Sequence, residues 1–220
     1  MFNLPVSTVV GKKIPKTKFY QHLSLSSKEK ETFIDEIEMI VWHHKLSPDT
    51  IAIRPGERVK EIQVFEVQLK QKQFNPVLLR LIDQAVPYHI LYLLTWRDEG
   101  CLAIGYKERK GKTDEYGRVN QYYYSEWMAR TTINPDFSGL SLDTIYEGLV
   151  RQILPDEQPQ LKNLKDTIHL QMEIEKQKRI CDALLRKVKN EKQFNIQILL
   201  NQDLRKERDR LDSLLAGLDP

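Results

Sequence analysis

Residues 59–95 read VKEIQVFEVQLKQKQFNPVLLRLIDQAVPYHILYLLT and combine two strand patterns with one helix pattern. The segment 59–70 carries apolar side chains on both faces of an alternating pattern, which predicts a strand inside a covered sheet. Residues 76–85 begin with proline and contain an apolar stripe, so they predict a helix. The run ILYLLT at 90–95 is short and continuously apolar, as expected of a buried strand. Because strand, helix and strand connect through a right-handed crossover, the two strands are predicted to be parallel.

Weaker patterns on either side extend this unit. They predict a helix at 27–44, a short strand at 50–53, strands at 101–106 and 121–128, and a helix at 142–153. Residues 1–20 contain four lysines and two prolines and are predicted to be an irregular basic arm. Together these elements predict an α/β fold, with α+β as the alternative, in which helices flank a mixed sheet of about five strands.

The composition of the chain changes at PDEQPQ, residues 155–160, where two prolines interrupt helical patterning. We predict a linker there, between a globular domain at 1–154 and a helical segment at 161–217 that is either a coiled coil or a helical hairpin. The first part contains all of the aromatic residues except one. The second part is rich in leucine, isoleucine, charged and amide residues, which is typical of long helices.

The helical segment carries two apolar stripes that are offset from each other by about two residues. The first consists of Leu170, Ile174, Cys181, Leu184, Val188 and Ile198, and the second of Leu200, Leu204, Leu211 and Leu215. The absence of glycine and proline between residues 160 and 216 favours one continuous helix over a hairpin. A single helix of that length cannot bury its stripe against one small domain. We therefore expect these residues to form an oligomer or to bind a partner protein.

Overall composition excludes several classes of protein. The net charge is +3, far from the strong basic bias of a dedicated nucleic-acid-binding protein, so charge permits nucleic-acid binding without arguing for it. The two cysteines, Cys101 and Cys181, lie in unrelated contexts and do not suggest a disulfide framework. The chain has no signal-peptide pattern and no apolar run long enough to cross a bilayer. We expect a cytoplasmic protein without membrane contact.

A nuclease-like metal site needs two carboxylates and a nearby lysine on adjacent strands, because the carboxylates hold a cation while the lysine activates water. Two groups of residues in the sequence resemble such a site imperfectly. Glu66 and Gln68 have the required spacing without the lysine, whereas Glu108 and Lys110 lie in a hydrophilic segment with Asp98 as the only nearby acid. These five residues are weak candidates for catalysis, and a solvated or structural role is the alternative for each.

No residue pattern predicts a metal or cofactor. His43 and His44 are adjacent on a predicted helix, so they point about 100° apart and cannot chelate one ion together. The other histidines and both cysteines lack zinc-ligand spacing. No glycine-rich phosphate loop and no nucleophile elbow is present.

Cations beside aromatic residues offer a second candidate function, because cations contact phosphates while rings stack on unpaired bases. One group lies in the N-terminal arm and comprises Lys12, Lys13, Lys16 and Lys18. The other precedes three consecutive tyrosines and comprises Lys107, Arg109, Lys110, Lys112 and Arg118.

The amino-acid sequence also resembles that of a known family. The segments FNLP, KKIPKTKFY, VWHHKLSPDTIAI, EIQVFEVQLK, LIDQAVPYHILYLL, IYEGLVRQI and EKQFNIQILLN are similar, over nearly the full length, to the prokaryotic family called domain of unknown function 4391. The resemblance implies no catalytic residues. It implies a place beside helicase and methyltransferase genes in restriction-like or antiphage clusters, and hence a helicase or methyltransferase as a candidate partner.

The sequence leaves two main functions and one further alternative open. The first is a non-enzymatic assembly or adaptor subunit, of a restriction or antiphage system, that oligomerises or docks through its C-terminal helix. The second is a divergent metal-dependent nuclease that uses Glu66 or Glu108, and a single-stranded nucleic-acid-binding module is a further alternative.

Overall fold

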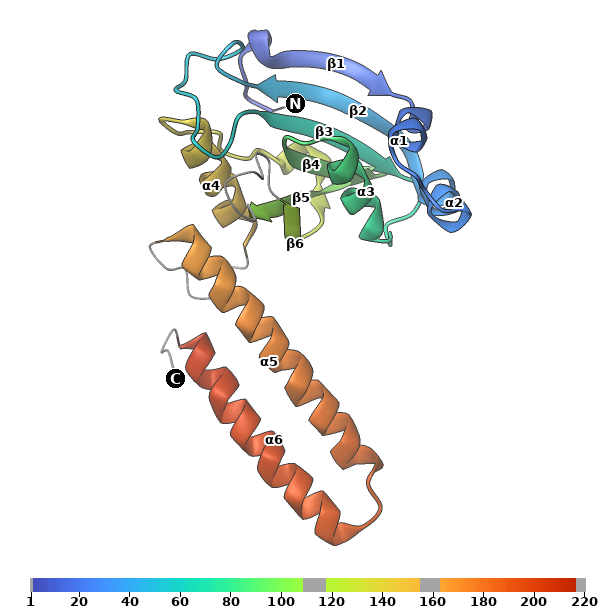
Figure 1. Cartoon of the computed structure of the whole chain (residues 1–220), viewed down its shortest axis with the longest axis vertical. Helices are drawn as coiled ribbons and strands as arrows, with labels where there is room; N and C mark the ends of the chain where they lie inside the picture. The colour runs from blue at the N-terminus through green and yellow to red at the C-terminus, as the bar shows by residue number, and fades with distance from the viewer. Residues whose placement is uncertain (1, 109–117, 155–162, 217–220) are drawn as a thin grey trace. The chain divides into compact units, whose positions relative to one another are not determined.

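The computed structural model describes residues 2–108, 118–154 and 163–216, and the chain divides into two compact units, Met1–Leu154 and Pro155–Pro220. We call them the sheet unit and the hairpin. Figure 1 shows strands and short helices in the sheet unit and two long helices in the hairpin. The linker predicted at 155–160 lies outside the described residues.

The sheet unit is built on a mixed sheet. Its strands are β1 Val9–Ile14, β2 Ile37–Leu46, β3 Ile62–Leu69, β4 His89–Trp96, β5 Glu99–Glu108, β6 Arg118–Tyr124 and β7 Met128–Ala129. They follow the order β1-β2-β3-β4-β5-β6, and β7 pairs with β5. Only the β3–β4 pair is parallel among the described strands. The sheet and its helices confirm the α/β class, although the described strands exceed the predicted five.

Helices cover both faces of this sheet. The elements are η1 Val6–Thr8, α1 Lys16–His22, α2 Ser27–Glu36, α3 Val77–Ala85, η2 Arg130–Thr132 and α4 Leu142–Ile153. A core of buried side chains joins α1, α2 and α3 to one face, where Phe65, Val67 and Tyr92 point. Because successive strand residues point to opposite faces, Val64 and Glu66 face the other side, and α4 contacts this face over β5 and β6.

The crossover predicted from residues 59–95 is confirmed. β3 and β4 pair in parallel from Ile62 opposite His89, and α3 connects them. The side chain of Asn75 accepts a hydrogen bond from the backbone N–H of Val77 at 3.1 Å, at the start of α3. The apolar stripe of α3 is buried, which fixes this helix on the sheet.

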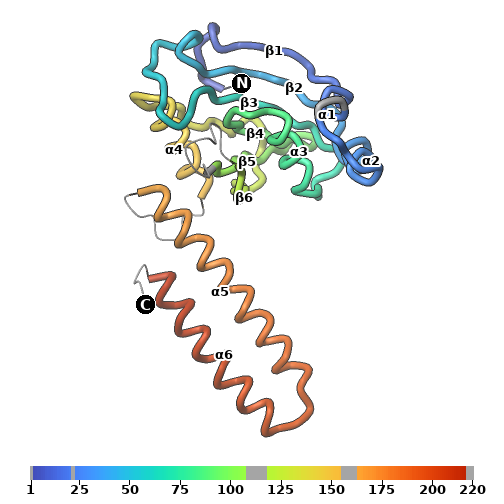
Figure 2. Tube along the Cα trace, in the orientation of Figure 1, coloured from blue at the N-terminus to red at the C-terminus, as the bar shows by residue number. Residues whose placement is uncertain are grey.

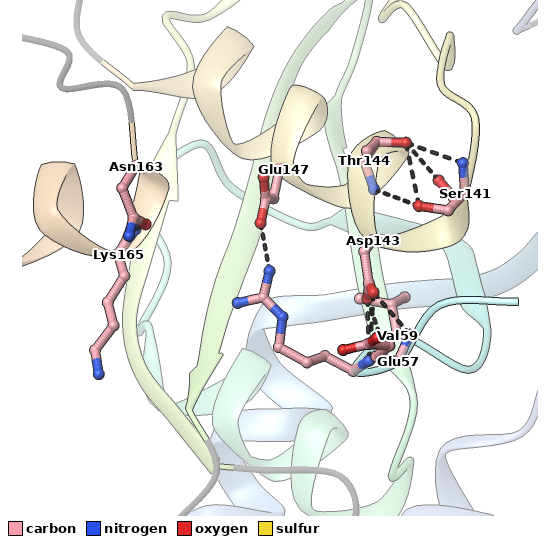
Figure 3. Close-up of polar contacts among 9 residues, drawn as sticks. Glu57, Val59, Ser141, Asp143, Thr144, Glu147, Asn163 and Lys165 are labelled. Carbon is pink, nitrogen blue, oxygen red and sulfur yellow. Dashed lines mark hydrogen bonds and ion pairs between the residues drawn. The ribbon is translucent and has the colours of Figure 1, made fainter.

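The start of α4 anchors the loop that leads into β3. Ser141 and Thr144 form a reciprocal capping box, and the carboxylate of Asp143 accepts hydrogen bonds from the backbone N–H groups of Glu57 at 2.7 Å and Val59 at 2.8 Å (Figure 3). Arg58 forms an ion pair with Glu147, one turn further along α4. These contacts tie residues far apart in sequence to one helix terminus.

The helix predicted at 27–44 is only half correct. Ser26 caps α2 through a capping box with Glu29, as its sequence suggested, but α2 ends at Glu36 and the chain continues as β2. Ile37 and Ile40 are fully buried, and β2 pairs with both β1 and β3. Tertiary strand pairing therefore overrides an apolar spacing that also fitted a helix.

Two further predictions are wrong, and a third is only partly correct. The N-terminal segment is not an irregular arm, because it contains β1 and α1, and Phe19 of α1 is buried in the core. Residues 50–53 do not form a strand, and the neighbouring Arg54 makes one isolated bridge to Ser141. The strand predicted at 121–128 ends at Tyr124, and β7 follows separately.

The C-terminal helices are α5 Leu164–Asn190 and α6 Phe194–Leu215, which run antiparallel (Figure 2). This corrects the preference for one continuous helix. The chain turns without glycine or proline because the Glu191 side chain accepts hydrogen bonds from the backbone N–H groups of Lys192 and Gln193, both at 2.8 Å. None of the described helices is long and apolar enough to cross a membrane.

Candidate functional site

Glu66 is a buried acid near the middle of the sheet. It lies on β3, which has strands on both sides, and the residue is 1% exposed. Its side chain points to the face opposite the α1–α3 core, toward the C-terminal ends of β3 and β4. A carboxylate at such a position needs hydrogen-bond donors, because removing a charge from water costs several kcal/mol.

Four side chains supply these donors, and we call the five residues together the Glu66 cluster. One carboxylate oxygen of Glu66 lies 2.6 Å from Nε2 of His43 and 2.9 Å from the guanidinium of Arg130. The other oxygen accepts hydrogen bonds from Gln68 and Thr95, both at 3.1 Å. The cluster thus joins β2, β3, β4 and η2.

These contacts keep Glu66 ionised. Burial alone raises the pKa of its carboxyl group, but hydrogen bonds from His43 and Gln68, the charge of Arg130 and the Thr95 hydroxyl outweigh burial. The pKa of Glu66 consequently lies below its ordinary value. The side chains of His43 and Arg130 remain 27% and 45% exposed, so the cluster reaches the protein surface.

The arrangement provides an oriented histidine and a cation at the surface. Glu66 fixes the imidazole of His43 through Nε2, while the Nδ1 atom has no hydrogen-bond partner among the described residues. A histidine held by a carboxylate can act as a general base, and a neighbouring arginine can stabilise an anion. The remaining oxygen lone pairs of Glu66 are occupied by neutral donors.

Sequence reasoning found part of this cluster. Glu66 and Gln68 are brought together as predicted from their spacing. Asp98 is an exposed residue of the β4–β5 turn, and it approaches the cluster only through its backbone carbonyl, which accepts a hydrogen bond from the backbone N–H of Arg130 at 2.8 Å. Glu108 ends β5, far along that strand from Asp98, and Lys110 lies outside the described residues.

Three members of the cluster were missed. His43 was assigned to a helix, although it lies on β2, and this error hid its contact with Glu66. Thr95 is the last residue of the apolar run ILYLLT, and a polar residue at the end of a buried strand could have indicated a polar site there. Arg130 had no local signal, because β7 and η2 bring it to the cluster from a distant part of the chain.

The cluster does not contain a set of ligands for a metal. Within residues 2–108, 118–154 and 163–216, no three histidine, cysteine or acidic side chains gather closely enough to hold an ion. His44 is committed elsewhere, since its Nδ1 lies 2.9 Å from the hydroxyl of Thr8.

The candidate nucleic-acid-binding cations do not form one surface. Lys12 and Lys13 are exposed on β1 at one edge of the sheet, and Lys18 is exposed on α1. Lys16 donates a hydrogen bond to the backbone carbonyl of Ile37. Lys107 and Arg118 lie on β5 and β6 at the opposite side of the sheet. Arg109, Lys110 and Lys112 lie outside the described residues.

The predicted oligomerisation residues mostly pack inside the hairpin. Its buried core consists of Cys181, Val188 and Leu204, and Leu184 and Leu211 pack against it. Ile174 is also buried, whereas Leu170 and Leu215 are half-buried and Ile198 is 41% exposed. The two apolar stripes therefore cover each other. Burial of these stripes does not by itself require an oligomer or a partner protein.

Exposed apolar residues are instead concentrated at the start of α6. We define the tip patch as Phe194, Ile196, Ile198 and Leu199, whose exposed fractions are 72%, 41%, 41% and 60%. Basic residues precede it at the end of α5 and in the turn, namely Arg186, Lys187, Lys189 and Lys192, and all four are exposed. The acid Glu191 lies among them but is used in the turn.

Comparison with known proteins identifies one match. A family model described as Domain of unknown function (DUF4391) matches residues 2–211. No curated protein and no solved structure matches the chain.

Proposed function

The chain belongs to the DUF4391 family, and we propose that it is a non-enzymatic adaptor subunit that docks onto an acidic surface of another protein through the tip patch of its hairpin. The observation that carries this proposal is the exposure of four apolar residues within six consecutive positions of α6. Contiguous exposed apolar side chains rimmed by polar residues are typical of protein interaction sites.

The geometry of a helix explains why α5 cannot cover this patch. Residues 194, 196, 198 and 199 point in several directions around the helix axis, since successive residues are separated by about 100°. A single neighbouring helix covers only one side. A helix that is apolar on most of its circumference is normally buried on more than one side, so the tip patch lacks a covering surface.

Charge indicates what kind of surface would cover it. The four basic residues beside the tip patch favour an acidic partner and disfavour a second copy in a tip-to-tip arrangement, which would bring like charges together. Aliphatic side chains such as Ile196 and Leu199 do not recognise bases, which favours a protein over a nucleic acid. A helicase or methyltransferase subunit, the partner class that the family resemblance implies, is the first to test.

Site-specific crosslinking in the source organism tests the proposal. A photoreactive phenylalanine at position 194 should give one adduct with a different protein, and the same residue at the exposed position Ile34 of α2 should not. Adding Lys187→Glu and Lys189→Glu should abolish the adduct. An adduct of twice the chain's mass, an adduct with nucleic acid only, or no adduct from folded protein would each overturn the proposal.

A double variant separates docking from folding. Phe194→Ser with Leu199→Ser removes two exposed side chains, so the free energy of unfolding should change by less than about 0.5 kcal/mol for each. Partner binding should fall by at least tenfold, because buried apolar anchors carry most of an interface's affinity. Binding that survives in the folded double variant would contradict the assignment.

The Glu66 cluster supports a second candidate function, a hydrolase acting on an anionic ester. The supporting observation is the 2.6 Å contact between His43 and a buried, ionised Glu66, beside the exposed Arg130. In this proposal Nδ1 of His43 removes a proton from water while the water oxygen attacks the phosphorus of a phosphodiester, and Arg130 stabilises the negative charge that develops on the phosphoryl oxygens. The bond from phosphorus to the leaving oxygen breaks, and the leaving alkoxide takes the proton from His43.

Variants of the cluster test this alternative. A chromogenic phosphodiester should be hydrolysed by the purified chain, and His43→Gln should lower kcat by at least a hundredfold, since general base catalysis typically contributes that much. His169→Gln, the same replacement at an exposed histidine of α5 outside the cluster, is the matched control. Equal rates for the chain and His43→Gln would exclude hydrolysis at this cluster.

A further inference from the structure

A pocket of about 740 Å³ opens on the α3 side of the sheet unit, and none of the residues that line it belongs to the Glu66 cluster. Helix α3 and the turn after it supply Arg80, Asp83 and Pro87, β5 supplies Lys107, and β6 supplies Arg118 and Tyr122. Its volume lies within the range of ordinary small-molecule sites. Lys107 and Arg118 are two of the cations that precede the three consecutive tyrosines in the sequence, and the fold brings both to this pocket.

A buried ion pair forms a rigid part of the pocket wall. Lys107 lies 3.1 Å from one oxygen of Asp83, and their side chains are only 3% and 7% exposed. The other oxygen of Asp83 accepts hydrogen bonds from the hydroxyls of Tyr92 at 2.9 Å and Tyr122 at 2.5 Å. The network connects α3, β4, β5 and β6, so the wall is fixed before any ligand binds.

Lys107 also holds the end of α3. Its ammonium group donates hydrogen bonds to the backbone carbonyls of Pro87 at 3.1 Å and Tyr88 at 2.5 Å. All three N–H donors of the Lys107 ammonium group are therefore used, and its positive charge offsets the negative charge of Asp83. A ligand in the pocket consequently meets a neutral wall at this point rather than an exposed carboxylate.

Among the described residues that line the pocket, the remaining charged ones are both cations. Arg80 and Arg118 are exposed, and within the part of the chain that the structure describes neither forms an ion pair or hydrogen bond. Two guanidinium groups beside a neutral wall attract an anion, and planar guanidinium groups suit phosphate.

We propose that this pocket binds a small organic phosphate of mononucleotide size. Arg80 and Arg118 hold the phosphate, and the apolar surface of Pro87, Val119 and Tyr122 contacts the organic part of the ligand. A pocket that combines two arginines with apolar walls distinguishes a phosphate ester from inorganic phosphate, which would use the arginines alone.

Calorimetric titration of the full chain tests this proposal with four probes: adenosine 5′-monophosphate, adenosine, ribose 5-phosphate and inorganic phosphate. The mononucleotide should bind most tightly, and adenosine should lose at least tenfold in affinity because it lacks the charge. Arg80→Gln and Arg118→Gln should each weaken mononucleotide binding about tenfold, as expected for the loss of one charge-assisted contact.

Arg97→Gln is the matched control. Arg97 lies in the β4–β5 turn, at the other end of β5 from Lys107, and its replacement should change the affinity less than twofold. Unchanged thermal unfolding of the Arg80 and Arg118 variants would show that their loss of binding is local. The proposal is overturned if no probe binds at millimolar concentration, or if all three variants bind the mononucleotide as tightly as the unchanged chain.

Discussion

At Glu66, the cost of burying a charge is opposed by unusually many donors. Burial disfavours the carboxylate, whereas contacts to charged donors contribute about 1.5–3 kcal/mol each. His43, Arg130, Gln68 and Thr95 all contact it, and the balance leaves the pKa below the ordinary value. Because His43 and Arg130 are partly exposed, the contribution of each ion pair is reduced by solvent screening.

Replacing Glu66 with glutamine should lower the free energy of unfolding at neutral pH by about 1–3 kcal/mol, because charge-assisted hydrogen bonds are lost. The folded pKa is depressed, so the stabilisation by Glu66 is present above the ordinary value of 4.5 and is lost as pH falls through the folded pKa. Urea unfolding from neutral pH to about pH 3 measures this. The difference between the two proteins should shrink with acidification, and a constant difference would contradict it.

Two glycines should respond oppositely to alanine. A Cβ atom at Gly56 would lie 2.5 Å from the Val59 carbonyl oxygen and 2.6 Å from the Asp143 carboxylate, so Gly56→Ala should destabilise the chain by about 1–3 kcal/mol. Gly148 lies within α4 with nothing near its Cβ position, so Gly148→Ala should stabilise by about 0.5–1 kcal/mol. Thermal unfolding checks both, and the same sign for both variants would be inconsistent with this packing.

Individual residues were predictable where chemistry follows from spacing along one strand. Glu66 and Gln68 are two residues apart, so their shared face could be predicted. The contacts of Glu66 with His43 and Arg130 depend on strand pairing and on η2, and residue spacing does not encode either one. The Asp83–Lys107 pair was missed for the same reason, since its members are joined only through the fold.

Among elements, the strongest local patterns gave the correct assignments. The β3–α3–β4 crossover and α4 combine marked apolar stripes with clear N-terminal signals. The helix predicted over residues 37–44 was wrong because its apolar residues fit a helix and a strand equally well, and the pairing of β2 with both β1 and β3 decided the outcome. The turn of the hairpin was not the favoured prediction because it contains neither glycine nor proline. The side chain of Glu191 instead accepts hydrogen bonds from the backbone N–H groups of Lys192 and Gln193.

The hairpin should depend on its small buried core. Leu204 is 4% exposed and packs with Cys181 and Val188, so Leu204→Ala should destabilise the hairpin by about 2–4 kcal/mol. Leu199→Ala on the same helix is the control, and it should cost less than about 0.5 kcal/mol because Leu199 is 60% exposed. Helical circular dichroism during thermal unfolding gives both values. Equal effects would show that the hairpin packs differently.

For the whole molecule, the division into two compact units predicts two separable folding reactions. The three tryptophans, Trp42, Trp96 and Trp127, all lie in the sheet unit, so their fluorescence reports on that unit alone. A chain ending at Leu154 should therefore keep the fluorescence transition of the full chain in urea, with its midpoint unchanged. Loss of the cooperative transition on truncation would show that the hairpin is needed for the sheet unit to fold.

The outer strand β1 has a consequence for how this protein meets other molecules. Gly11 adopts a positive φ of 61°, the pairing with β2 is irregular between Val9 and Lys12, and Lys12 and Lys13 are exposed. Bends and lysines on an outer strand discourage strand addition by another chain, because they spoil the template of free backbone groups. Lys12 and Lys13 therefore disfavour the pairing of a strand from another chain with β1. Association with other molecules then depends on contacts between side chains.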